Sequence, residues 1–157
     1  MTSANTPNRF ERKDWIEALN LAQKARLLEI RDGLTNFPDT QFLRKPEFGL
    51  AMIRGRAGGT GKAFNLGEVT VTRCVVAIPD TLTGDRIDGV ACIAGRDKQR
   101  AELVAQLDAI FQDSGIGSAV RETAMSVLHS DREAMLAKRA SEAAATKVDF
   151  FTMERGH

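Results

Sequence analysis

Hydrophobic positions recur with helical spacing at both ends of the chain and with strand-like spacing in the middle. One apolar face spans residues 15–22 of a helix that begins near residue 11, and a second apolar set spans residues 27–34. A turn near Gln23 would separate two helices, and without it the pattern fits one helix. Gly33 is a plausible stop for either version.

The middle of the chain predicts strands. Residues 48–53 are apolar on both faces, residues 69–78 are rich in Val, Thr and Ile, and residues 87–94 form another run. Short glycine-containing turns, such as residues 83–85, favour antiparallel pairing. Proline and glycine punctuate the first part of this region at Pro38, Pro46, Gly49 and Gly55. The sequence predicts an antiparallel sheet of about four strands.

Helical periodicity returns after Gly95. One apolar stripe predicts a helix over residues 97–113, and another helix follows over residues 118–128. A capping box at residues 130–133 would open an alanine-rich helix through residue 145, which has little to bury by itself. The predicted fold class is α+β, with N-terminal and C-terminal helices flanking the sheet and an extended apolar C-terminal tail. Residues 1–10 are expected to be a mobile leader and residues 11–157 a single domain.

Composition narrows the possible partners. Lys and Arg number 22 against 21 Asp and Glu, so the net charge of +1 draws the chain neither to nucleic acid nor to a membrane. Two cysteines are too few for a disulfide framework or a thiolate metal site, so no metal is expected. The polar N-terminus lacks a signal peptide, and no apolar run is long enough to span a membrane. These features indicate a cytoplasmic protein.

A glycine loop is the first candidate site; its residues are Gly58, Gly59, Thr60, Gly61 and Lys62. The Walker pattern fails because Arg56 stands in place of its first glycine and Ala63 in place of its Ser or Thr. The dinucleotide pattern fails at Phe64. Two interpretations stay open: a turn that cradles an anion or receives a partner, and a plain loop that uses glycine for positive φ.

Basic residues surround a predicted helix start at Arg96, Asp97 and Lys98. Asp97 suits the N-cap, whereas cations at the positive end of a helix are unusual unless an anion or a partner carboxylate lies there. Solvated surface charge is the equally weighted alternative. Arg73 interrupts an apolar and threonine-rich strand, which an edge position or an exposed face of the sheet explains more simply than an anion ligand does.

The C-terminal tail carries Phe150, Phe151 and Met153. An apolar tail either folds back onto its own core or is buried in a partner, and the sparse alanine-rich helix before it favours the partner.

Few other residues of the sequence suggest catalysis. His129 is far in sequence from the terminal His157, which leaves no histidine-based triad. Asp108 and Asp113 fall on helical patterns and are expected on solvated faces. Cys74 and Cys92 lie in predicted strands, where buried inert thiols are usual. No catalytic residue is identified.

Several of these motifs together resemble the PhnG subunit of the bacterial carbon–phosphorus lyase system. The resemblance spans residues 49–156 and rests on the glycine loop, the strand at residues 67–73, the Gly95-Arg96-Asp97-Lys98-Gln99 junction and the run at residues 148–156. It implies a subunit of a cytoplasmic complex in which a phosphonate displaces the adenine of ATP from the ribose. The product would be a ribose 1-phosphonate 5-triphosphate.

The resemblance also implies how the activity is divided among the subunits of the complex. The partners would be other core subunits, especially a nucleosidase-like subunit that bears the active site. ATP would be the substrate of the complex, and no cofactor would be bound by this chain alone. A purely structural adaptor and an independent phosphate or nucleotide binder remain as alternatives.

Overall fold

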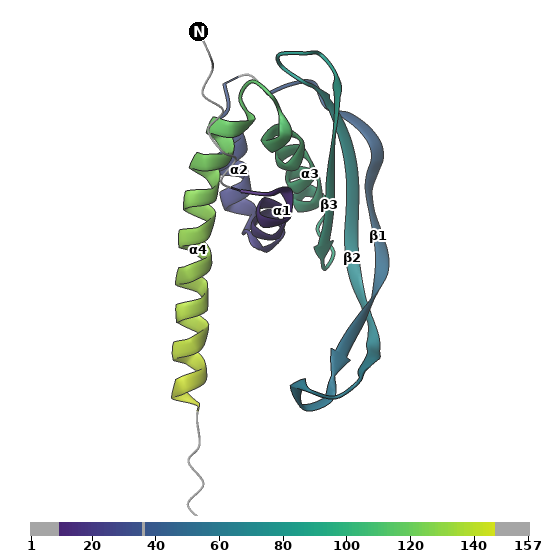
Figure 1. The fold of residues 1–157 in the computed structure, drawn as a ribbon, viewed down its shortest axis with the longest axis vertical. Coiled ribbons are helices and arrows are strands. Elements are labelled where there is room, and N and C mark those ends of the chain that lie inside the picture. Colours follow the sequence, from purple (N-terminus) through teal and green to yellow (C-terminus); the bar gives the residue numbers. More distant parts are fainter. Residues whose placement is uncertain (1–9, 36, 147–157) are drawn as a thin grey trace, which may run out of the picture.

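The computed structural model describes residues 10–35 and 37–146 of the 157-residue chain. The elements run in the order α1 (Arg12–Leu21), α2 (Lys24–Asp32), β1 (Gln41–Arg56), a 3-10 turn (Ala57–Gly59), β2 (Ala63–Pro79), β3 (Arg86–Ala94), α3 (Lys98–Gln112) and α4 (Gly117–Ala145). The predicted α+β order of helices, strands and helices is confirmed (Figure 1). The chain does turn at Gln23, so the N-terminal segment forms two helices, and Gly33 caps the second.

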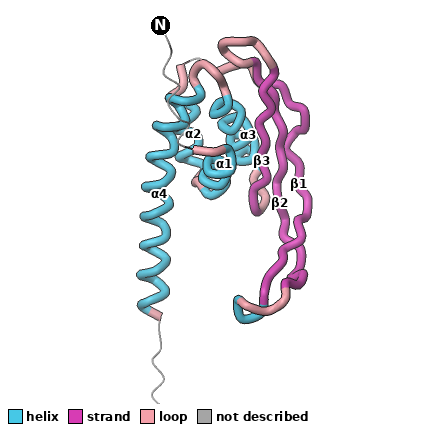
Figure 2. The backbone as a smooth tube through the Cα atoms, in the orientation of Figure 1, coloured by secondary structure: helices cyan, strands magenta, loops and turns pink. Residues whose placement is uncertain are grey.

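The sheet is antiparallel, as predicted, but its described strands number three, in the order β1-β2-β3, instead of about four. Pro46, Gly49 and Gly55 all lie inside β1, which continues for 16 residues without interruption (Figure 2). Pro46 is tolerated because β1 is an edge strand and because its register with β2 shifts between Arg44 and Glu47. Two long strands therefore replace several short ones.

The core lies between the sheet and α3. Alternate residues of β2, including Cys74, Val76 and Ile78, are buried on the face that α3 covers, called the inner face from here. The predicted apolar stripe of α3 packs against them, with Leu107 and Phe111 fully buried. Gly89 of β3 permits this close approach, since a Cβ there would come within 2.0 Å of the Ala105 carbonyl oxygen. α1 and α2 lie between α3 and α4 in Figure 1.

α4 is one continuous helix of 29 residues, so the predicted division at residue 130 was wrong. Neither glycine nor proline occurs between Ser118 and Ala145, and alanine is abundant there. The helix therefore continues through Ser130, and the capping-box pattern has no helix start to cap.

A pair of aspartates fastens the start of α4 to the β2–β3 turn. Asp113 accepts hydrogen bonds from the Thr81 backbone N at 2.7 Å and the Thr81 hydroxyl at 2.6 Å. Asp80 accepts from Ser114 N at 2.9 Å in the opposite direction, and from two amides of its own turn. The prediction of a solvated Asp113 was wrong, because the side chain is buried in this clasp.

The hydrogen bonds of Asp80 and Asp113, together called the clasp, explain two pKa shifts. Amide donors, led by the Thr83 and Ser114 backbone N–H groups, lower the pKa of Asp80. Burial alone would raise the pKa of Asp113, but the hydrogen bonds from Thr81, Ile116 and Gly115 together lower it. Both carboxylates are therefore stabilised in their charged form.

Two parts of the chain extend beyond the helical layer, on the same side of it in Figure 1. β3 pairs with β2 only as far as Val71, the partner of Gly49, so residues 50–70 form a two-stranded projection; together with Phe48 and Gly49 at its root, this projection is called the arm from here. The second half of α4 is the other projection. Its side chains are mostly exposed, as the alanine-rich composition predicted.

Candidate functional site

The glycine loop lies at the tip of the arm, where it joins β1 to β2. Gly58 and Gly59 have φ angles of 59° and 76°, which favour glycine. The Gly61 N–H closes the turn on the Ala57 carbonyl at 3.0 Å. A Cβ at Gly58 or Gly59 would meet nothing within 4 Å, so this side of the loop is open. Thr60 and Lys62 are exposed beside them.

Arg96 and Lys98 converge on one aromatic ring. The Arg96 guanidinium carbon lies 5.4 Å and the Lys98 Nζ 5.1 Å from the centroid of Phe48, on β1. Asp97 between them is the N-cap of α3, as predicted, and accepts from Arg100 N at 2.9 Å. Neither cation forms an ion pair with a carboxylate in residues 10–35 or 37–146. Two unpaired positive charges therefore flank an exposed ring at the root of the arm.

Arg73 lies on the opposite face of the sheet from Phe48. Its register partner is Glu47, one position before Phe48, and successive side chains of a strand point to opposite faces. The guanidinium passes over Gly49 and donates to the Leu50 carbonyl oxygen at 3.1 Å. The exposed-face interpretation of Arg73 fits this placement. The three candidate anion contacts thus lie at the arm's tip, on its inner face and on its outer face, and do not share one pocket.

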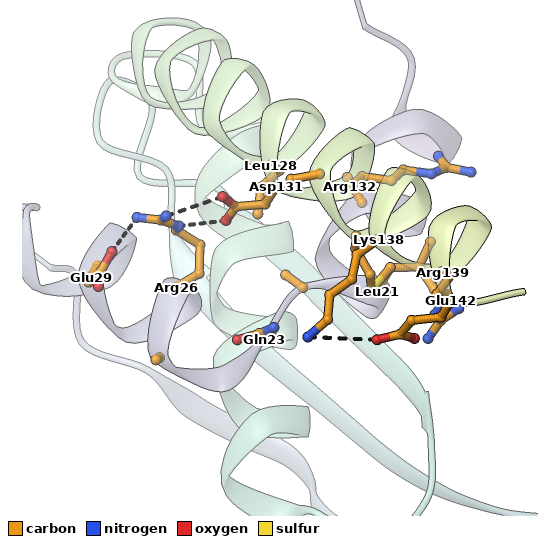
Figure 3. Close-up of a pocket in the computed structure, with 15 residues that line it drawn as sticks. Leu21, Gln23, Arg26, Glu29, Leu128, Asp131, Arg132, Lys138, Arg139 and Glu142 are labelled. Atoms are coloured by element: carbon orange, nitrogen blue, oxygen red, sulfur yellow. Dashed lines mark hydrogen bonds and ion pairs between the residues drawn. The ribbon is translucent and has the colours of Figure 1, made fainter. Parts of the chain in front are cut away.

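A groove of about 590 Å³ lies between α4 and the α1–α2 turn (Figure 3). Two of its four cations are firmly paired: Arg26 binds Asp131 at 2.7 Å and also pairs with Glu29, and Arg132 binds Glu17 at 2.8 Å. Lys138 lies 4.0 Å from Glu142, and Arg139 forms no ion pair with another described residue. The hydrogen bond from Arg26 lowers the pKa of Asp131. An anion at Arg26 or Arg132 would have to displace a carboxylate, so these two cations are poor anion contacts.

The described residues offer no nucleophile with a base. Glu122, Ser126 and His129 share a shallow depression on α4 with Phe10. The Ser126 hydroxyl, however, donates to the Thr123 carbonyl at 2.8 Å, and His129 stacks on Phe10 with 5.9 Å between ring centroids. Acyl transfer would require a nucleophile that is hydrogen-bonded to a base, and glycosyl transfer would require a positioned acid. Ser126 and His129 have other partners and do not form such a pair.

Asp108 was expected on a solvated face, but it is fully buried. It accepts from Trp15 Nε1 at 2.9 Å, from Val90 N at 2.9 Å and from Arg12 Nη2 at 2.7 Å. These contacts join α1, β3 and α3, so the residue holds the fold together. A periodic pattern could not reveal this, since the partners are 18 to 96 residues away in sequence.

Arg100 is a second structural residue that the sequence did not reveal. Its guanidinium donates to the carbonyl oxygens of Ala22, at 3.1 Å, and Asn20 at the end of α1. A cation is favourable at a helix C-terminus, and these bonds use carbonyls that the helix leaves free.

The two cysteines differ. Burial raises the pKa of the Cys74 thiol to about 11, so it is an inert core group, as predicted. Cys92 is exposed, which contradicts the prediction of a buried thiol, because its side chain points to the uncovered face of β3.

The predicted docking residues Phe150, Phe151 and Met153 lie outside the described residues, as does most of the leader. In the part of the chain that is described, no helix has the length and apolarity needed to cross a bilayer. No cluster of His, Cys, Asp or Glu in the same residues is arranged to hold a metal ion.

Comparison with known proteins identifies the family. The family model for phosphonate metabolism protein PhnG matches residues 10–156. A protein of Rhizobium meliloti (strain 1021) named alpha-D-ribose 1-methylphosphonate 5-triphosphate synthase subunit PhnG is 41% identical over 147 residues, which cover 89% of this chain and 88% of that protein. The chain belongs to the PhnG family.

Proposed function

We propose that this chain is a subunit of a complex that makes alpha-D-ribose 1-methylphosphonate 5-triphosphate in phosphonate catabolism. The observation that carries the proposal is the 41% identity, across nearly the whole chain, with a protein named as a subunit of that synthase. The resemblance rested on separate motifs, whereas this identity is measured over 89% of the chain. The complex is placed in the cytoplasm, where ATP is available.

The reaction defines what the complex must contain. An oxygen of the phosphonate attacks the anomeric carbon of ATP, the bond from that carbon to adenine breaks, and the departing adenine takes up a proton. The triphosphate stays on the ribose. Such a step needs an acid for the leaving base, donors that stabilise an oxocarbenium-like state and cations that hold the phosphonate. ATP is thus a substrate of the assembly, and this chain needs no cofactor of its own.

This chain supplies cations and contact surfaces instead of the acid. No acid–base pair occurs among its described residues, so the proposal assigns the active site to a nucleosidase-like partner subunit. Arg96 and Lys98 are the best-supported contacts for an anion, whether a substrate phosphonate or a partner carboxylate, because both lie beside the same ring and neither forms an ion pair within the described residues. The glycine loop, residues 58–62, and Arg73 would contact the partner from other sides of the arm. Phe150, Phe151 and Met153 would anchor the tail.

Adenine release tests the proposal. The chain should be purified alone and together with its partner subunits, then supplied with ATP and methylphosphonate. The complete set should release adenine, and the chain alone should not. Full activity from the chain alone would contradict a subunit role, and full activity from the partners without this chain would show that it is dispensable.

Three variants separate a co-catalytic subunit from a structural adaptor. Arg96→Ala and Lys98→Ala should lower turnover by the intact complex if these cations contact the substrate anion. If turnover is unchanged while Phe150→Ala disperses the complex, the adaptor role is favoured. Calorimetry of the isolated chain with ATP or methylphosphonate tests independent binding, and measurable affinity would favour that alternative.

A further inference from the structure

The arm exposes more apolar surface to solvent than a two-stranded hairpin can bury by itself. Four large apolar side chains of its β1 strand are exposed: Phe48 by 47%, Leu50 by 56%, Met52 by 52% and Ile53 by 40%. They lie on both faces, and Phe64 and Leu66 of β2 add to them. A two-stranded hairpin without a core to pack on is only marginally stable in water. This surface therefore fits burial against another chain.

The free edge of β1 is unprotected along the arm. Natural edge strands are usually blunted by charge, proline or bulges. Residues 48–53 contain none of these, and their register with β2 is uninterrupted from Glu47 to Ile53. The free edge of β2 in the arm is less regular. It has an extra residue at Leu66, a glycine with φ of 151° at Gly67 and a charge at Glu68.

The direction of the backbone groups along this edge follows from one hydrogen bond. The Thr70 carbonyl accepts from Gly95 N at 2.9 Å, so Thr70 faces β3 and not β1. Its register partner Leu50 must then direct its own N–H and C=O away from β2, because opposite residues of an antiparallel pair bond in alternation. Arg73 confirms this direction, since it reaches over Gly49 to the Leu50 carbonyl.

By the same alternation, the backbone groups of Phe48 and Met52 also point to the free edge, whereas those of Gly49, Ala51 and Ile53 face β2. The arm thus presents three outward N–H groups in a row, together with the carbonyls of Phe48 and Met52, while the Leu50 carbonyl already accepts from Arg73. A strand laid beside them would find regularly spaced partners, which is the geometry of strand addition.

The positive charge of the arm indicates which kind of chain could bind the free edge of β1. Residues 41–79 carry Arg44, Lys45, Arg54, Arg56, Lys62 and Arg73 against Glu47 and Glu68, a net charge of +4 in a chain whose total is +1. Arg96 and Lys98 add two unpaired cations at one end of the apolar run, and Arg54 and Arg56 lie at the other end. A second copy of this chain would bring the same positive charge to the edge, which disfavours a homodimer through the arm.

We infer that the free edge of β1 over residues 48–53 receives an extended strand from another subunit of the complex, with an apolar centre and carboxylates toward both ends. The inference rests on the proposed function only for the origin of that strand. The main-chain bonds would hold the strand, the apolar centre would cover Leu50 and Met52, and the carboxylates would meet the cations that flank them.

Amide exchange on the unaltered protein tests the edge directly. The full-length chain is compared alone and in its co-purified complex, with residue-level readout. The N–H groups of Phe48, Leu50 and Met52 should gain the largest protection, by about tenfold or more if the contact is worth about 1.4 kcal/mol. Unchanged exchange at these amides, or protection confined to the β2 edge, would overturn strand addition.

Variants at Leu50 separate the backbone from the side chain. Leu50→Pro removes an N–H that makes no bond to β2, and Leu50→Ala removes only the side chain. The proline variant should weaken co-purification by about tenfold more than the alanine variant, with no comparable loss in thermal stability of the isolated chain. Leu136→Ala, at a similarly exposed leucine of α4, is the matched control and should have no effect.

The outcomes distinguish this inference from the proposed function. If the unaltered chain fails to co-purify with any other subunit, membership of the complex is contradicted, and strand addition falls with it. If the complex forms and both Leu50 variants behave like the control, strand addition alone is overturned. Binding of the isolated chain to anionic phospholipid vesicles that Leu50→Pro abolishes would assign the arm to a membrane and would also overturn it.

Discussion

The two halves of β2 have opposite environments. From Val71 to Ile78 the strand lies between β1 and β3 and is covered by α3, with Cys74 and Val76 fully buried. From Ala63 to Glu68 the same strand has only β1 beside it, and all its side chains are exposed. Apolar residues occur in both halves. Hydrophobic residues in this chain therefore serve two purposes, folding at one end of β2 and, by our proposal, assembly at the other.

The largest loss of stability is expected from removing the buried carboxylate of Asp108, which joins α1, β3 and α3. Asp108→Ala should lower the free energy of unfolding by about 3–5 kcal/mol, because Arg12 and Trp15 lose their buried partner. Urea denaturation measures it. Asp85→Ala, which removes an exposed carboxylate from the β2–β3 turn, is the control and should stay within about 0.5 kcal/mol. Equal effects from the two would mean that Asp108 is not the fastening point described.

A matched pair of leucines compares the two halves directly. Leu107→Ala in the core should destabilise by about 2–5 kcal/mol, since it leaves a cavity under α3. Leu50→Ala in the arm should change stability by no more than about 0.5 kcal/mol, because the side chain is already in water. The same denaturation curves report both. If Leu50→Ala proved as damaging as Leu107→Ala, the arm would be packed within the isolated chain and the comparison would fail.

Glycines give a second pair, with a smaller expected difference. Gly89→Ala would put a Cβ against the Ala105 carbonyl, so α3 must move away from β3, at a cost of about 3 kcal/mol. Gly58→Ala meets no atom and is penalised only for its positive φ, by about 1 kcal/mol. Thermal unfolding ranks the two. The reverse order would contradict the close α3–β3 contact.

How far the sequence predicted this molecule depends on the range of the interactions involved. α3 was correctly predicted because its apolar stripe and its N-cap Asp97 are local signals. The arm was not foreseen, because a run that is apolar on both faces looks like a buried strand, and the sequence does not say which chain covers it. Asp108 was misjudged for a related reason: its partners become neighbours only after the chain folds.

α4 shows a conflict between two local signals. The capping pattern at residues 130–133 favoured a new helix start, while the unbroken helix-forming residues on both sides favoured continuation. Continuation prevailed because ending a helix also requires a stop, and none precedes Ser130. The candidate anion contacts were located as surface features, but their separation on three sides of the arm required the sheet register.

Lowering the pH is expected to reduce the stability of the fold gradually, through Asp80 and Asp113. Folding lowers the pKa values of Asp80 and Asp113, so their contribution is complete above the unfolded value of about 3.9 and is lost as the pH falls toward the folded values. The melting temperature should therefore be flat from pH 7 to about pH 5 and decline below it. Asp113→Asn should make that decline shallower. An unchanged slope in this variant would show that the clasp is not responsible.

Assembly through the arm and the subunit role are tested together by adenine release from ATP and methylphosphonate, measured with partner subunits that are supplied with either the unaltered chain or Leu50→Pro. Release is expected with the unaltered chain, none from the chain alone, and a loss with Leu50→Pro although that variant is folded. Equal release with both forms would contradict assembly through the edge of β1. Release by this chain alone would contradict its role as a subunit.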